Sequence, residues 1–143
     1  MILNKSGVKK LAQKISQKLK GGEIFLLIGD LGAGKTFFSQ ELGKELGANK
    51  IKSPTFVILH LHITNKDFDL AHFDFYRLNS KEIDFFEWSD YLGKSNYVSL
   101  IEWGERIKPK ISQMKYFAIT IKILENGQRD FILSNNLIKW LKN

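Results

Sequence analysis

The sequence predicts an α/β fold whose sheet is mixed, partly antiparallel, with helices on both of its faces. Short apolar runs typical of buried strands alternate along the chain with segments of helical periodicity, which favours a sheet covered by helices. Two pairs of strands are each separated by a short turn, "TNKD" at 64–67 and "ENGQ" at 125–128. Tight turns between strands indicate hairpins, so an all-parallel sheet is not expected.

Four segments are expected to be helical. A second helix over 35–46 ends at Gly47, and further helices are expected over 80–92 and in "NNLIKWLK" at 135–142. The first helix, over 6–19, ends before Gly21-Gly22. Its amphipathic character is predicted by apolar residues at helical spacing, namely Val8, Leu11, Ala12, Ile15 and Leu19.

The strands are expected over 23–28, 55–63, 68–76, 97–101, 116–124 and 129–133. The run "IFLLI" at 24–28 is apolar throughout, as in a strand that is buried on both faces. In 55–63 apolar residues alternate with more polar ones, which is the pattern of a half-buried strand. Because no repeat or Pro-rich linker divides the chain, residues 1–143 are expected to form a single domain.

Composition excludes several classes of protein. The chain has no cysteine, which excludes a disulfide scaffold and thiolate metal sites. Its longest purely apolar run, 24–28, is far shorter than the ~20 residues needed to cross a bilayer. The start of the sequence lacks the apolar core of a signal peptide. We therefore expect a cytoplasmic protein without membrane association.

The formal net charge of +7 favours acidic partners, nucleic acid among them. Six lysines fall in the first twenty residues with no acidic residue among them: Lys5, Lys9, Lys10, Lys14, Lys18 and Lys20. A packed helix with a solvated lysine face is the favoured interpretation, and contact with RNA or an acidic protein surface is the alternative. No heptad seam or spare apolar face is visible, so the chain alone is expected to be a monomer.

A phosphate-binding loop is predicted by "GDLGAGKT" at 29–36, which matches G-x-x-x-x-G-K-[ST] between an apolar strand and a helical pattern. Glycines let backbone N–H groups converge on an anion at the start of the helix. Lys35 reaches the terminal phosphates, and the hydroxyl of Thr36 is placed to bind a bridging Mg²⁺. The nucleotide-binding residues are expected to be Gly29, Asp30, Leu31, Gly32, Ala33, Gly34, Lys35 and Thr36. The sequence thus predicts a single P-loop NTPase-like domain.

Magnesium held in this way requires a carboxylate at the end of a neighbouring strand. Glu102 follows the apolar run "YVSLI" and is the better candidate; Asp74, which follows "LAHF", is the other. If both face the loop, one holds the metal and the other orients the attacking water or holds a metal-bound water. The nucleotide is expected to be ATP, because "NKDF" at 65–68 does not match the guanine signature N-K-x-D.

Four strings occur in order along the chain: "GDLGAGKT" (29–36), "KSPTF" (52–56), "HFDFYRL" (72–78) and "IEWGERI" (101–107). Together they resemble the TsaE family, the small P-loop ATPases of bacterial threonylcarbamoyl-adenosine tRNA modification. The resemblance implies that Thr36 and Glu102 are the Mg²⁺ ligands and that Asp74 is required for function. It also implies that Ser53, Pro54 and Thr55 form a switch near the γ-phosphate and that Trp103 lies next to the nucleotide. The expected catalytic residues are therefore Asp74, Lys35 and Thr55.

The family resemblance also implies partners. Its members do not transfer the threonylcarbamoyl group themselves; they bind a transferase heterodimer, the catalytic subunit and its paralogue, and ATP supports repeated turnover. This chain is expected to hydrolyse ATP slowly alone and to meet tRNA, if at all, through that complex. A small P-loop kinase that phosphorylates a metabolite and a pure nucleotide-binding module are the alternatives. One departure is Gly104, which stands where the family usually has proline and predicts a looser turn after Trp103.

The remaining polar and aromatic residues receive structural interpretations. Surface salt bridges are the favoured interpretation for Arg77 and Arg129, and contact with phosphate or RNA is the alternative. His60 and His62 are expected to share one face of a hairpin strand, and His72 to support Asp74 rather than to bind metal. A core role is favoured for three aromatic residues, namely Phe85, Phe86 and Trp88.

Overall fold

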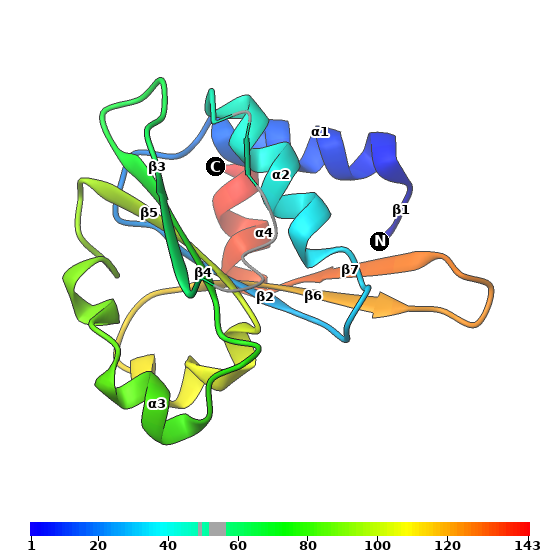
Figure 1. Cartoon of the computed structure of the whole chain (residues 1–143). Helices are drawn as coiled ribbons and strands as arrows, with labels where there is room; N and C mark the ends of the chain where they lie inside the picture. Colours follow the sequence, from blue (N-terminus) through cyan, green and yellow to red (C-terminus); the bar gives the residue numbers. More distant parts are fainter. Residues whose placement is uncertain (49, 52–56) are drawn as a thin grey trace.

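A computed structural model describes residues 1–48, 50–51 and 57–143 of the chain. Within them, one seven-stranded sheet has the strand order β1-β7-β6-β2-β5-β4-β3 (Figure 1). The strands are β1 (Ile2–Leu3), β2 (Ile24–Ile28), β3 (Leu59–His62), β4 (Asp69–Asp74), β5 (Tyr97–Glu102), β6 (Phe117–Ile123) and β7 (Arg129–Leu133). The helices are α1 (Lys5–Ser16), α2 (Lys35–Glu45), α3 (Ser80–Phe85) and α4 (Asn135–Lys142), and 3₁₀ turns cover Trp88–Asp90, Gly104–Arg106 and Lys108–Ile111.

The centre of the sheet is parallel and its edges are antiparallel. β2 runs parallel to both β5 and β6, and β4 runs parallel to β5. The hairpins β3–β4 and β6–β7 and the short β1 add antiparallel strands at the two sides. The prediction of a mixed sheet is therefore confirmed. Because parallel strands end at the same edge of the sheet, the loop after β2 meets the ends of β4 and β5.

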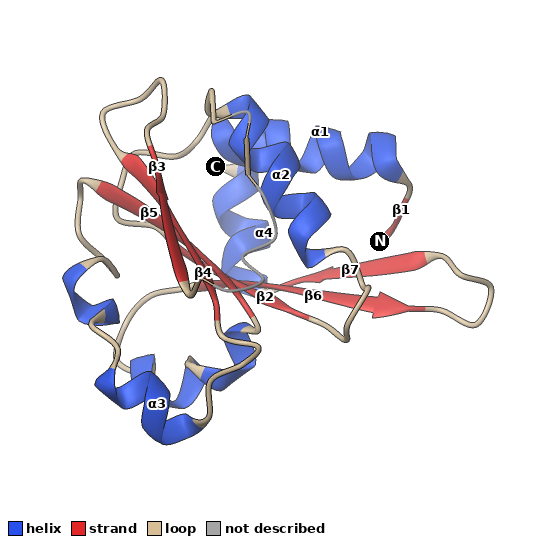
Figure 2. Cartoon of the chain, viewed as in Figure 1, coloured by secondary structure: helices blue, strands red, loops and turns tan. Residues whose placement is uncertain are grey.

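The two faces of the sheet carry separate apolar cores, as the alternation of side chains along β2 requires. Phe25 and Leu27 belong to the core under α1, α2 and α4, whereas Ile24 and Leu26 belong to the core on the α3 side. Figure 2 shows α1, α2 and α4 on one side of the strands and α3 with the 3₁₀ turns on the other. Helices on both faces were predicted, and this arrangement confirms them.

The helix expected over 80–92 is wrong in its extent. α3 begins with a capping box between Asn79 and Glu82 but ends at Phe85, because Phe86 has an extended backbone (φ −82°, ψ 134°). That turn places the ring of Phe86 against Phe73 and Phe75, with ring centroids 6.2 Å and 6.4 Å apart. Packing against these rings has overridden local helix propensity.

The same turn decides the places of the neighbouring aromatic residues. Phe86 and Trp88 are partly buried against the core, as expected. Phe85 is 88% exposed, so the core role expected for it is wrong. No sequence pattern predicted β1 or the 3₁₀ turns after β5, because two-residue strands and 3₁₀ turns have no hydrophobic periodicity.

The strand expected over 55–63 is shorter in the structure, where β3 spans Leu59–His62; residues 55 and 56 lie outside the described part of the chain.

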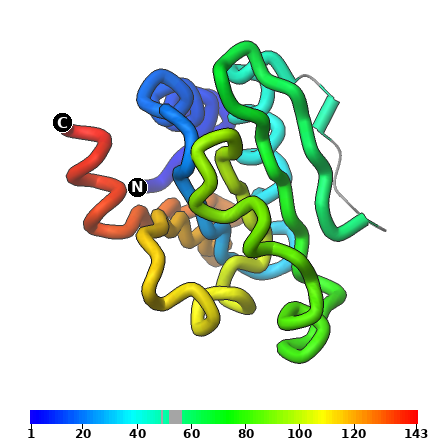
Figure 3. The backbone as a smooth tube through the Cα atoms, turned by 90° about the vertical axis from the view of Figure 1, so that its left-hand side faces the viewer, coloured from blue at the N-terminus to red at the C-terminus, as the bar shows by residue number. Residues whose placement is uncertain are grey.

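No helix in the described part of the chain is long and apolar enough to cross a membrane. In the view turned by 90°, both ends of the chain lie on the same side of the molecule (Figure 3).

Gly104 packs directly against the central strand, so the looser turn expected from it is wrong. A Cβ at this position would lie 2.5 Å from Cβ of Leu26 and 2.9 Å from its Cα. Gly104 is buried and begins the 3₁₀ turn that follows β5. Absence of a side chain therefore allows a close backbone approach that brings this turn onto β2.

Gly104→Ala is expected to lower the free energy of unfolding by about 1–3 kcal/mol, because the added methyl group overpacks a site next to backbone. Urea denaturation measures the change. Gly7→Ala is the matched control, since its Cβ would meet the side chain of Leu3 at 3.1 Å within a helix that favours alanine. Equal stability of the Gly104→Ala variant and the parent chain would contradict the packing argument.

Candidate functional site

The loop between β2 and α2 has a backbone that only glycine adopts easily. Gly32 has φ +78° and Gly34, the N-cap of α2, has φ +113°. No atom of the described residues lies within 4 Å of a Cβ built at either position, so for this part of the chain the requirement is conformational rather than steric. Among the described residues no side chain caps α2, and the first N–H groups of a helix are suited to bind an anion.

Lys35 lies folded back over its own loop. Its Nζ donates to the carbonyl oxygens of Gly29 at 2.5 Å and Asp30 at 3.0 Å. The ammonium also lies 4.1 Å from the ring centroid of Trp103. Burial lowers the pKa of Lys35, and the surrounding carboxylates, of which Glu102 has the largest effect, oppose that shift. The side chain is thus held at the mouth of the loop by groups that a phosphate would replace.

A buried carboxylate connects three elements of the site. Glu102, 2% exposed at the end of β5, accepts from Oγ1 of Thr36 at 2.7 Å. On its other oxygen it meets Nε2 of His72 at 2.5 Å and Oγ of Ser39 at 3.4 Å. An ionised carboxylate only accepts hydrogen bonds, so an ionised Glu102 requires the donor tautomer of His72, with the proton on Nε2. These contacts satisfy a charge that would otherwise be costly to bury.

His72 therefore makes its hydrogen bond to Glu102, so the hydrogen bond to Asp74 that was one form of the expected support is not the one formed. The difference comes from side-chain length. Asp74 is short, lies at the end of β4 and accepts from the backbone N–H of Tyr76 at 2.9 Å. The longer side chain of Glu102 reaches the ring of His72 from the neighbouring strand.

Asp74 and Glu102 are register partners on adjacent parallel strands, so both carboxylates face the loop. Burial raises the pKa of Asp74, and the negative charge of Glu102 raises it further. The hydrogen bond from Tyr76 and the positive charge of Lys35 act in the opposite direction. A carboxyl group with a raised pKa beside a phosphate loop is suited to accept a proton from water.

Trp103 is held in an unusual conformation beside the loop. It has φ +59°, a left-handed backbone rarely adopted by residues with a side chain, and its ring lies 4.9 Å from that of Tyr76. Arg106, which sequence reasoning did not single out, lies 5.5 Å from the Trp103 ring. Its guanidinium donates to the carbonyls of Phe75, Tyr76 and Leu78. The sequence signal that could have indicated Arg106 is its position in the string "IEWGERI" at 101–107.

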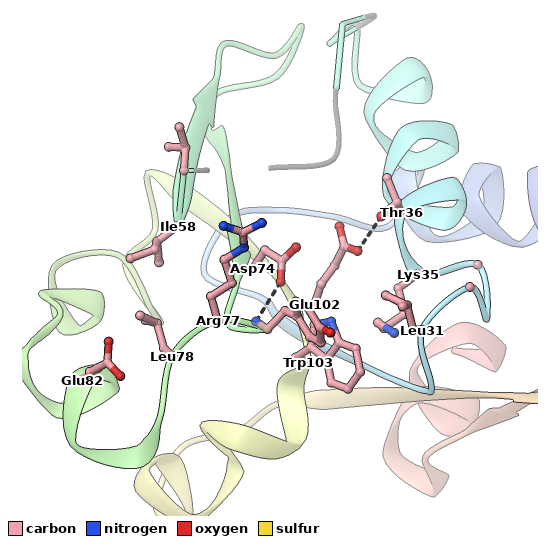
Figure 4. A pocket seen from close by; sticks show the side chains of 14 residues that line it. Leu31, Lys35, Thr36, Ile58, Asp74, Arg77, Leu78, Glu82, Glu102 and Trp103 are labelled. Carbon is pink, nitrogen blue, oxygen red and sulfur yellow. Dashed lines mark hydrogen bonds between the residues drawn. The ribbon is translucent and has the colours of Figure 1, made fainter. Parts of the chain in front are cut away.

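The phosphate loop, the ends of β4 and β5 and the segment after β4 line a pocket of about 540 Å³ (Figure 4). The sequence-predicted residues that line it are Leu31, Gly32, Gly34, Lys35, Thr36, Asp74, Glu102 and Trp103. The backbone carbonyls of Gly29 and Asp30 accept hydrogen bonds from Lys35, and Ala33, a residue of the loop itself, is buried. Thr55, with Ser53 and Pro54, lies outside the described residues. The chemical roles assigned to all of these residues stay predictions.

The arginines and remaining histidines were placed by tertiary contacts. Arg129 donates to the loop carbonyl of Gly32 at 3.3 Å and to the carbonyl of Gly127, so the salt bridge expected for it is wrong. Arg77 lines the pocket. The rings of His60 and His62 stack 5.9 Å apart, which confirms that they share one face.

Three comparisons identify relatives. The family model described as "Threonylcarbamoyl adenosine biosynthesis protein TsaE" matches residues 2–131. The chain is similar to the tRNA threonylcarbamoyladenosine biosynthesis proteins TsaE of Rickettsia prowazekii, 39% identical over 88% of this chain and 87% of the relative, and of Aquifex aeolicus, 40% identical over 70% and 71%. Among solved structures, Bacillus subtilis YdiB superposes with a TM-score of 0.71 at 26% identity, covering 98% of this chain and 87% of that one. The chain therefore belongs to the TsaE family.

Proposed function

We propose that the chain binds Mg²⁺–ATP and hydrolyses it slowly, as an accessory protein in threonylcarbamoyl-adenosine modification of tRNA. In this role it acts on the threonylcarbamoyltransferase heterodimer and does not carry out the transfer itself. The observation that carries the proposal is the contact of Glu102 with Thr36, which joins a strand-end carboxylate to the phosphate loop. Membership of the TsaE family and the names of the relatives support the pathway.

The residues of the site fit a magnesium nucleotide. The uncapped start of α2 and the glycine backbone of the loop offer N–H groups to phosphates. The hydroxyl of Thr36 and the carboxylate of Glu102 are oxygen ligands of the kind that Mg²⁺ prefers, and two protein ligands are sufficient for it. Bound there, Mg²⁺ would neutralise charge on the β- and γ-phosphates.

The protein side chains supply orientation and proton acceptance. Lys35 turns from the carbonyls of Gly29 and Asp30 towards the terminal phosphates. Asp74 accepts the proton of the attacking water, which its raised pKa favours. His72 and Ser39 hold the Glu102 carboxylate in one rotamer. Slow turnover by the chain alone is part of the proposal.

Lys35→Ala is expected to abolish multiple-turnover threonylcarbamoylation of tRNA in a reconstituted reaction with the transferase pair, substrates and ATP. The variant lacks the cation that binds the terminal phosphates. Lys94→Ala, at an exposed lysine far from the loop in sequence, is the control and should support full activity. Equal modification with the parent chain, with Lys35→Ala and without any added chain would refute the role in this pathway. ADP formation that requires a small-molecule acceptor would indicate a kinase instead.

His72→Leu is expected to weaken Mg²⁺ binding by about 10–100-fold, because Glu102 loses the partner that fixes its orientation. Titration of Mg²⁺ at saturating ATP measures the apparent dissociation constant. His72→Gln retains an N–H donor and should restore part of the affinity, whereas His60→Leu should change nothing. An unchanged Mg²⁺ dependence in a folded His72→Leu variant would show that the contact has no positioning role.

Asp74→Asn is expected to raise the free energy of unfolding at neutral pH while it lowers ATP hydrolysis. A carboxyl group whose folded pKa is raised destabilises the fold once pH rises above its unfolded pKa, and fully above its folded pKa. The gain in stability should therefore disappear in acid, where the carboxyl group is protonated in both states. Urea denaturation across pH tests this, with the exposed Asp67→Asn as control. A gain that persists in acid would contradict the electrostatic cause.

A further inference from the structure

Residues of α1, β7 and α4, together with Met1, line a second concave surface. Figure 1 shows where these three elements and the N-terminus lie. This groove has a volume of about 720 Å³ and shares no lining residue with the nucleotide pocket. Its apolar floor comprises Leu11, Phe131, Leu133, Ile138 and Leu141. The sequence predicted no spare apolar face, because these residues come from three separate segments.

The floor is open enough to receive side chains. Ile138 of α4 is 37% exposed, and Leu133 and Leu141 are only partly buried. Phe131, in contrast, is 2% exposed and presents no free aromatic face. A floor of accessible aliphatic carbon favours apolar side chains over nucleobases, which bind by stacking on exposed rings.

The rim of the groove is cationic. Lys14 of α1, Lys18 just beyond the end of α1 and Lys142 of α4 line it, and no ion pair among the described residues joins any of them to a carboxylate. The acidic residue of the lining, Asp130, already contacts the backbone nitrogen of Met1 at 2.9 Å. The rim therefore attracts carboxylates and repels a second copy of this chain, which would bring the same lysines.

The edge of β7 adds a main-chain anchor. β1 pairs with Asp130 and Arg129, and Phe131 still donates its N–H to the carbonyl of Met1 at 2.8 Å. Backbone groups alternate in direction along an antiparallel strand, so the N–H and C=O of Leu133 point to the same side as those of Phe131. No described strand continues far enough to pair with Leu133 there.

We propose that this groove docks an extended peptide segment of a partner protein in which apolar side chains alternate with carboxylates. The apolar side chains enter the aliphatic floor, the carboxylates meet Lys14, Lys18 and Lys142, and the peptide backbone pairs with Leu133. The inference goes beyond the nucleotide chemistry, and it does not require that chemistry to be as proposed.

The first test titrates the ¹⁵N-labelled full chain with a synthetic peptide of about ten residues in which leucine alternates with glutamate. Saturable chemical-shift changes are expected at Leu133, Ile138 and Leu141. A leucine–lysine peptide and a serine–glutamate peptide should bind weakly or not at all. Equal binding of all three peptides, or shifts confined to the loop at 29–36, would overturn the proposal.

Matched variants test the floor and the rim separately. Ile138→Asp and the pair Lys14→Glu with Lys18→Glu should each weaken peptide binding by about tenfold or more. The controls are Ile63→Asp, at an 83% exposed residue elsewhere, and Lys5→Glu with Lys9→Glu on the other flank of α1. Neither should change peptide affinity. Thermal melting shows which variants are folded, and a folded Lys14→Glu, Lys18→Glu variant that binds normally would overturn the assignment.

Three further probes distinguish other occupants. A polyuridine oligonucleotide, phosphatidylglycerol vesicles and the chain itself at high concentration are expected to leave Ile138 and Leu141 unshifted. If any of the three shifts the signals of Ile138 and Leu141 and binds more tightly than the peptide, that ligand replaces the peptide as the assigned occupant. Mg²⁺–ATP binding measured on the groove variants should stay unchanged, so failure here is distinguishable from failure of the proposed nucleotide function.

Discussion

The buried carboxylate of Glu102 is the point on which the site depends. It accepts from Thr36 at the start of α2 and from His72 on β4, while its own backbone ends β5. A charge with 2% exposure needs such partners, since leaving it unpaired away from water costs several kcal/mol. The same hydrogen bonds therefore stabilise the fold and hold the oxygen atoms where a metal ion would be bound.

Around that carboxylate, the turn after β5 is fixed by close packing. Gly104 allows the chain to approach Leu26, and Trp103 has a left-handed backbone directly before it. Arg106 then bonds to three carbonyls of the segment that follows Asp74. Strain at Trp103 is thus offset by its neighbours, an arrangement typical of functional sites. Its consequence is a tryptophan ring fixed over Lys35.

β7 contacts the phosphate loop and also lines the groove. Arg129 contacts the phosphate loop through the carbonyl of Gly32, and Asp130, the next residue, lines the groove beside α1. One short strand therefore contributes residues both to the contact with the phosphate loop and to the groove. The nucleotide pocket is formed by strand ends, whereas the groove is formed by a strand edge and two helices.

The sequence by itself determined the elements whose information is local. The phosphate loop, the alternation of strands and helices, and the acids ending β4 and β5 follow from spacing and hydrophobic period. Tertiary structure alone decided the partners of the polar groups that make contacts between segments distant in sequence. The contact of His72 with Glu102 and that of Arg129 with Gly32 join residues 30 and 97 positions apart. The end of α3 at Phe85, the packing of Gly104 and the groove between α1, β7 and α4 likewise depend on neighbours distant in sequence. No local pattern encodes them, because packing selects among conformations that the local sequence leaves close in energy.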